Sequence, residues 1–124
     1  MSDPPRKDSV LGIVGPCSAG KSTLIGYLHD LGYICRHIAQ EHSYVPDMWL
    51  RIVNPTVLIY LDVTYPISLQ RRPLNLSAQE FEEQTKRLAH ARQNADVYVN
   101  TDPLTPDQVF QFVLNSLQDL EIQP

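Results

Sequence analysis

Residues 9–31 read SVLGIVGPCSAGKSTLIGYLHDL, and this segment is the strongest indication of the fold because it combines three signals in direct succession. A short apolar run ends in Gly15, which is typical of a strand that is buried on both faces of a sheet. A glycine-containing turn follows, and then leucines recur at helical spacing at positions 24, 28 and 31. The stretch therefore predicts a strand, a tight loop and a helix.

The turn matches the pattern G-x-x-x-x-G-K-[ST] at every position from 15 to 22. Its glycines let successive backbone N–H groups approach phosphate oxygens, and the N-terminus of the following helix adds its own unpaired N–H groups. In such a P-loop, Lys21 reaches the β- and γ-phosphates and Ser22 offers its hydroxyl to Mg²⁺. The predicted phosphate-binding residues are Gly15, Pro16, Cys17, Ser18, Ala19, Gly20, Lys21, Ser22 and Thr23.

Strand-like and helix-like patterns alternate along the rest of the chain. Further strands are expected over residues 33–39, 56–63 and 95–100, and helices over residues 46–53, 66–72 and 78–92 and from residue 105 onward. Capping patterns at 77–80 and 105–108 mark the starts of the last two helices. Alternation at this spacing is typical of right-handed crossovers and parallel strands. The predicted fold is therefore α/β: a three-layer α/β/α sandwich with a mainly parallel four-stranded sheet and a P-loop after the first strand.

The composition is that of an ordinary globular domain. The chain has 124 residues, of which 43% are hydrophobic and 19% charged, and this size suits one domain. Residues 1–8 are polar and contain two prolines, which predicts a flexible leader before a single nucleotide-binding domain at 9–122.

Charge and hydropathy bound the partners and the location. The net charge of -4 argues against a nucleic-acid partner, since phosphate backbones are bound by an excess of Lys and Arg. No run approaches the roughly 18 apolar residues of a membrane span, and the start lacks the apolar segment of a secretory signal. We therefore expect a cytoplasmic protein with no membrane partner.

Two acids follow strand-like runs and are candidates, with Ser22, for holding Mg²⁺. Asp62 closes the run VLIYLD, as a Walker B acid would, and Glu41 follows the second predicted strand. Each acid also has a possible role other than metal binding. Asp62 suits a turn or helix-capping carboxylate before Pro66, and Glu41 suits a solvated loop acid.

Arg71 and Arg72 end a predicted helix just before a proline. Phosphoryl transfer spreads negative charge over the moving group, and arginines on a short lid would stabilise that charge. Lys21, Arg71 and Arg72 are therefore the predicted catalytic residues. The alternative is a solvated helix end at which Arg complements the helix dipole.

Taken together, these features resemble the nucleoside and nucleotide kinase-like P-loop proteins, a group that includes shikimate, adenylate and dephospho-coenzyme A kinases. The resemblance is carried by the loop at 15–23, by VLIYLDV at 57–63 with the helix after it, and by RLAHARQNADVYVNTDPLTPDQV at 87–109. It extends over most of residues 9–120. It implies that adenine rests on the turn at 101–105 and that lid arginines close on the phosphates.

This chain departs from the group by being shorter. Those kinases usually have five parallel strands and a substrate-binding segment between the second and third, where this chain has only residues 40–55. If VLIYLDV is the strand before the lid, the usual acid-bearing third strand is missing. Glu41 then replaces Asp62 as the better metal candidate.

The expected activity is that of a small kinase-like phosphotransferase that uses ATP and Mg²⁺ and acts on an unidentified small-molecule acceptor. The alternative is a nucleotide-binding switch or module that hydrolyses its nucleotide slowly and has no acceptor substrate. A GTPase is disfavoured because the chain has no N-K-x-D segment to read guanine.

Overall fold

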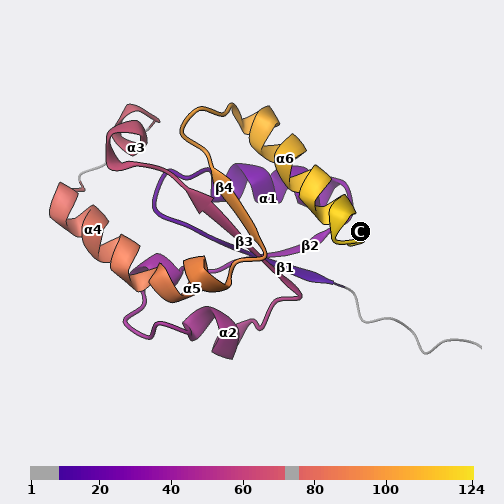
Figure 1. The fold of residues 1–124 in the computed structure, drawn as a ribbon, viewed down its shortest axis with the longest axis horizontal. Helices are drawn as coiled ribbons and strands as arrows, with labels where there is room; N and C mark the ends of the chain where they lie inside the picture. Colours follow the sequence, from indigo (N-terminus) through magenta and orange to yellow (C-terminus); the bar gives the residue numbers. More distant parts are fainter. Residues whose placement is uncertain (1–8, 72–75) are drawn as a thin grey trace, which may run out of the picture.

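The computed structural model describes residues 9–71 and 76–124 (Figure 1). The predicted leader at 1–8 and the predicted catalytic Arg72 lie outside the described residues. The strands are β1 (Val10–Val14), β2 (Ile34–His37), β3 (Val57–Asp62) and β4 (Val97–Asn100). They form one sheet in the order β2-β1-β3-β4, and all three pairings are parallel. The predicted α/β class and the four-stranded parallel sheet are confirmed.

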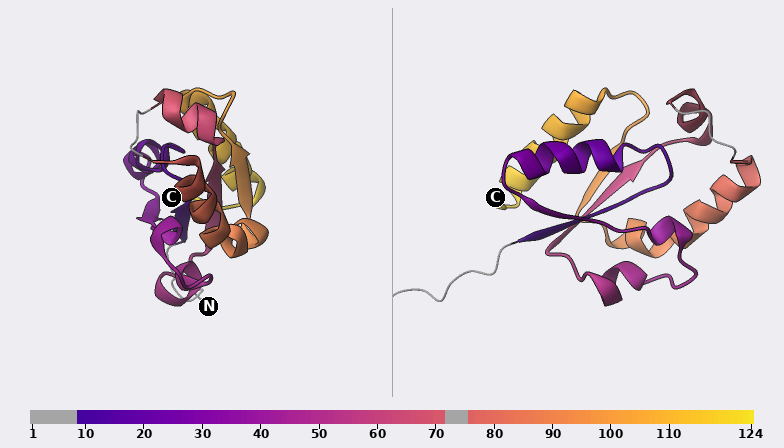
Figure 2. Two further views of the ribbon diagram at one scale, coloured as in Figure 1. Left: turned by 90° about the vertical axis from the view of Figure 1, so that its left-hand side faces the viewer. Right: turned by 180° about the vertical axis from the view of Figure 1, so that it is seen from behind.

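Helices cover both faces of this sheet (Figures 1 and 2). They are α1 (Lys21–Asp30), α2 (Met48–Ile52), α3 (Tyr65–Arg71), α4 (Ala78–Arg87), α5 (Ala89–Asn94) and α6 (Pro106–Asp119), with a 3₁₀ turn η1 at Gln40–His42. Among the described residues, no helix is both long and apolar enough to cross a membrane. Helices on both faces agree with the predicted three layers.

Two apolar cores lie on opposite faces of the sheet, and β3 contributes to both. Val57, Ile59 and Leu61 pack with α1 and α6 in one core. Leu58 and Tyr60 pack with residues of α2 and α5 in the other. Successive side chains of a strand point to opposite faces, so β3 is buried along almost its whole length. This explains why its sequence is a nearly unbroken apolar run rather than an alternating one.

The continuous helix predicted over residues 78–92 is wrong, because a turn at Leu88 divides it into α4 and α5. Phe81 and Leu88 are seven residues apart and would share one face of a straight helix. In the structure Phe81 enters the core beside α1 and α6, whereas Leu88 enters the opposite core. The break at Leu88 therefore allows α4 and the turn after it to contribute side chains to both cores. The capping boxes predicted at Ser77 and Thr105 are both formed.

Candidate functional site

The loop between β1 and α1 lies at the carboxyl end of the sheet. Two of its positions accept only glycine without strain. A Cβ at Gly15 would collide with the carbonyl oxygen of Leu61 in β3. Gly20 has φ +94°, in the left-handed region that other residues avoid. Ser18 also has a positive φ, of +66°, and strained backbone of this kind is concentrated at functional sites. The predicted succession of strand, loop and helix is confirmed.

Lys21 is buried beside this loop and is held by three acceptors. Its Nζ donates to the carbonyl oxygens of Gly15 and, at 3.4 Å, of Pro16, and it forms an ion pair with Glu41. The side chains of Lys21 and Glu41 are only 7% and 4% exposed. Glu41 reaches the loop because β2 pairs directly with β1. The alternative of a solvated loop acid is therefore wrong for Glu41.

Asp62 has different partners. Its Oδ1 accepts from the N–H of Val63 at 3.0 Å, its Oδ2 accepts from the hydroxyl of Tyr98, and Arg92 Nη2 lies 3.7 Å from Oδ2. These partners come from the end of β3, from β4 and from α5. The structure therefore brings Glu41 to Lys21, and it places Asp62 in a separate polar cluster.

The segment that carries Glu41 is fixed by the buried amide of Gln40. Gln40 Nε2 donates to the carbonyls of Val45 (2.8 Å) and Arg87 (3.3 Å), and Oε1 accepts from the N–H of Trp49 (2.9 Å). Arg87 in turn donates from Nη1 to the carbonyl of Glu41 at 3.3 Å. The turn η1 is thus attached to both α2 and α4, which sets the position of the Glu41 carboxylate.

Gln84 on α4 holds Cys17 in the loop, and sequence reasoning missed this role. Its Oε1 accepts from the N–H of Cys17 at 3.2 Å, and its Nε2 donates to Cys17 Sγ at 3.3 Å. Gln84 is 4% exposed. The only signal in the sequence was its spacing from Phe81 on one helical face, which does not reveal what the face contacts.

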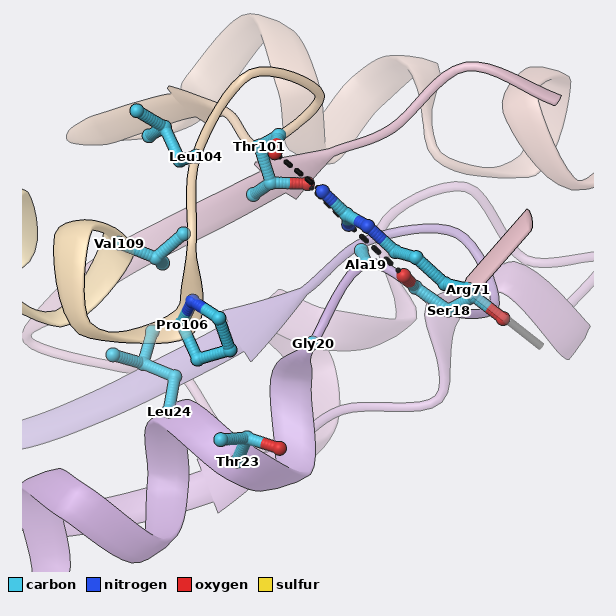
Figure 3. Close-up of a pocket in the computed structure, with 10 residues that line it drawn as sticks. All are labelled: Ser18, Ala19, Gly20, Thr23, Leu24, Arg71, Thr101, Leu104, Pro106 and Val109. Carbon is cyan, nitrogen blue, oxygen red and sulfur yellow. Dashed lines mark hydrogen bonds between the residues drawn. The ribbon is translucent and has the colours of Figure 1, made fainter. Parts of the chain in front are cut away.

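A pocket of about 360 Å³ opens on the other side of the loop (Figure 3). It lies between the loop, the first turn of α1, the end of α3, the turn at 101–105 and the start of α6. The lining residues are Ser18, Ala19, Gly20, Thr23, Leu24, Arg71, Thr101, Leu104, Pro106 and Val109. Ser22, the other hydroxyl of the first helical turn, is exposed.

Arg71 lies at one edge of this pocket and connects the loop with the turn before α6 (Figure 3). Its Nη1 donates to Thr101 Oγ1 at 2.8 Å and to the carbonyl of Ser18 at 3.2 Å, and its Nη2 donates to the carbonyl of Thr101. Thr101 Oγ1 donates in turn to the carbonyl of Asp62 at 2.7 Å. The predicted catalytic Arg71 therefore joins the loop to the turn before α6.

His37 at the end of β2 senses the charges of this site. Burial is the main cause that lowers its pKa, the charge of Lys21 lowers it further, and the charge of Glu41 opposes the shift. The site thus offers a buried ammonium, a neighbouring carboxylate and the unpaired N–H groups of the α1 N-terminus, with a largely apolar pocket beside them. No protein-family model matches the sequence, and no curated protein matches it.

Proposed function

We propose that this protein binds ATP with Mg²⁺ through a P-loop at residues 15–23 and acts as a small kinase-like phosphotransferase on a small-molecule acceptor. The observation that carries the proposal is the position of Lys21. Its ammonium lies at the start of α1 against the carbonyls of the loop itself, where a polyphosphate would replace those carbonyls as its partner. The alternative is a switch that hydrolyses ATP slowly, and the second experiment below distinguishes this switch from a phosphotransferase.

The start of α1 supports phosphate binding independently of Lys21. Gly20 is the N-cap and has no side chain with which to cap the helix. The first N–H groups of a helix have no partner within it, and they carry part of the positive end of the helix dipole. An anion at this point would accept from these groups while paired with Lys21.

Glu41 and Ser22 are the residues that we propose for Mg²⁺. Both offer oxygen donors, which Mg²⁺ prefers. Among the described residues, Glu41 Oε1 is buried and has no hydrogen-bond partner, as expected of an oxygen that a cation satisfies. Asp62 is the weaker candidate, because Tyr98 and the N–H of Val63 engage its oxygens. When bound, Mg²⁺ would neutralise charge on the β- and γ-phosphates.

The pocket beside the loop suits the base of the nucleotide. Leu24, Leu104 and Val109 give it an apolar floor, and Arg71 and Pro106 also line it. The apolar floor and the proline ring suit a flat aromatic ring, and the Arg71 guanidinium is bonded to Thr101 and Ser18 beside them. Backbone groups of the turn at 101–105 would then bond the polar edge of adenine.

The first test is ATP binding measured by calorimetry with Mg²⁺ present. Lys21→Met should weaken binding about tenfold to a hundredfold, the scale for losing a charged hydrogen bond. Lys21→Met/Glu41→Gln avoids leaving a buried carboxylate unpaired and should bind at least as weakly, because it also removes a proposed Mg²⁺ ligand. Lys86→Met on α4, where Lys86 is 66% exposed, is the matched control and should bind as the wild type does. Unchanged affinity in both loop variants would contradict nucleotide binding at this loop.

The second test decides between transfer and hydrolysis. The wild-type protein is incubated with γ-labelled ATP, Mg²⁺ and a panel of nucleosides, nucleotides and small alcohols. A phosphotransferase should move the label onto one acceptor faster than it releases phosphate. Slow phosphate release with every acceptor, together with tight ATP binding, would instead assign the switch function.

A further inference from the structure

Cys17, Glu41 and His42 come together beside the loop. Their potential ligand atoms, namely Cys17 Sγ, a carboxylate oxygen of Glu41 and an imidazole nitrogen of His42, all lie within 4.8 Å of one another. Cys17 comes from the loop after β1, whereas the other two come from η1 after β2. The direct pairing of β1 with β2 is what brings these two segments together.

The carboxylate of Glu41 gives a separate indication of a cation at this place. Glu41 is 3% exposed, and its Oε2 is paired with Lys21. Its Oε1 is buried and, among the described residues, has no hydrogen-bond partner. A buried charged oxygen without a partner is costly. A metal ion bound by Oε1 would remove that cost while Oε2 keeps its ion pair.

We propose that Cys17, Glu41 and His42 form a site for a borderline-soft divalent cation of the Zn²⁺ type. The donor set decides the class of metal, because thiolate and imidazole bind Zn²⁺ well, whereas Mg²⁺ prefers oxygen. Three protein ligands leave one tetrahedral position for water or another small ligand. This site shares Glu41 with the proposed site of the nucleotide's Mg²⁺, so the two ions would compete for the same carboxylate oxygen, and the Zn²⁺-type site is measured without nucleotide.

Neighbouring groups already support the ligands. Gln84 donates from Nε2 to Cys17 Sγ at 3.3 Å and accepts from the N–H of Cys17 at 3.2 Å, so one amide orients both the thiol and its backbone. Arg87 fixes the backbone of Glu41. His42 is exposed, which leaves a path for a cation from solvent.

The test is titration of the full chain with Co²⁺ in the absence of nucleotide, followed by displacement with Zn²⁺. Cobalt bound by a thiolate gives a sulfur-to-metal charge-transfer absorption, which reports Cys17 directly. The expected result is one Co²⁺ per chain with this absorption, lost on addition of Zn²⁺ and unaffected by excess Mg²⁺. Cys17→Ser should abolish the absorption, and His42→Ala should weaken Co²⁺ binding about tenfold or more.

Matched controls exist for both ligands. Cys35→Ser removes the other cysteine, and burial raises the pKa of Cys35 to about 11, so that thiol stays protonated at neutral pH and is a poor ligand. His29→Ala removes an exposed histidine on α1. Both controls should bind Co²⁺ as the wild type does, and circular dichroism would verify that every variant is folded. Binding without the thiolate absorption, displacement by Mg²⁺, or full retention of the absorption in folded Cys17→Ser would overturn the proposal.

Discussion

At the scale of single residues, the ammonium of Lys21 and the carboxylate of Glu41 are two buried charges that depend on each other. Removing either charge from water is unfavourable, and only the partner and the surrounding hydrogen bonds offset that cost. Lys21 has the carbonyls of Gly15 and Pro16 as further acceptors. Glu41 depends more heavily on Lys21. Its Oε2 is paired with Lys21, and its Oε1 has no hydrogen-bond partner among the described residues.

This difference between the partners of Lys21 and Glu41 predicts the stability of the variants. Lys21→Met leaves the Glu41 carboxylate buried and unpaired, so the free energy of unfolding should fall by about 3–5 kcal/mol. Lys21→Met/Glu41→Gln removes both charges and should recover most of that loss. Urea unfolding at neutral pH, extrapolated to water, measures both values. A single variant as stable as the double variant would show that the pair is not buried in solution.

The motif was sufficient to predict that Lys21 begins the helix after the loop, but the local pattern alone could not choose between Glu41 and Asp62, and only the resemblance to the kinases favoured Glu41. Both acids follow apolar runs, and either satisfies the local pattern. The strands β2 and β3 both lie beside β1, so the choice depends on which side chains meet each carboxylate. Tyr98 and Arg92 engage Asp62 from β4 and α5, and nothing in the local sequence around position 62 indicates that contact.

At the scale of elements, the short helix α3 matters because its last residue reaches two other elements. Arg71 donates to the carbonyl of Ser18 in the loop and to Thr101 before α6. The sequence predicted this helix from Pro66 and the arginine pair, and it predicted α4 and α6 from their capping boxes, because these signals are local. It did not predict the break at Leu88. The helical pattern there is continuous, and only the presence of two separate cores requires a turn.

Arg71 therefore has two expected effects within the proposed function. Arg71→Ala should lower the single-turnover rate by about a hundredfold, the scale for losing a transition-state donor. It should also weaken ATP binding, since Arg71 lines the pocket. Arg71→Lys keeps the charge but loses the planar fork that bonds Thr101 and Ser18, and it should recover little of either effect.

Rapid-quench measurement with γ-labelled ATP gives the rate, and calorimetry gives the affinity. Arg51→Ala is the control, because Arg51 is 70% exposed on α2 and pairs with Asp47. A rate in Arg71→Ala equal to that of the wild type would remove Arg71 from the catalytic residues. The transition-state donor would then have to lie elsewhere.

At the scale of the whole molecule, the sheet order β2-β1-β3-β4 determines how the site is built. Both β2 and β3 lie directly beside β1. The segment after β2 brings Glu41 to Lys21, and the end of β3 brings the Leu61 carbonyl against Gly15. With β4 beside β3, the turn at 101–105 lies across the pocket from the start of α1. The number of strands and their parallel pairing followed from the alternation of apolar runs and helices. The order of strands did not, because it depends on long-range packing that periodicity does not encode.

The pocket joins segments that are distant in sequence, so a nucleotide bound there should stabilise the whole domain. A ligand at a hundredfold excess over its Kd adds about 2.7 kcal/mol to the free energy of unfolding, which raises Tm by several degrees in a domain of this size.

Guanine recognition calls for an acceptor that faces its N–H groups, and no acidic side chain is among the described residues that line the pocket. ATP with Mg²⁺ should therefore raise Tm more than GTP with Mg²⁺ at equal concentration. Lys21→Met/Glu41→Gln should lose most of the ATP shift, because the ammonium and the proposed Mg²⁺ ligand are both gone and only the N–H groups of α1 and the base pocket remain to bind. Displacement of labelled ATP by GTP at a much lower concentration than by unlabelled ATP would contradict the assignment of this pocket to adenine.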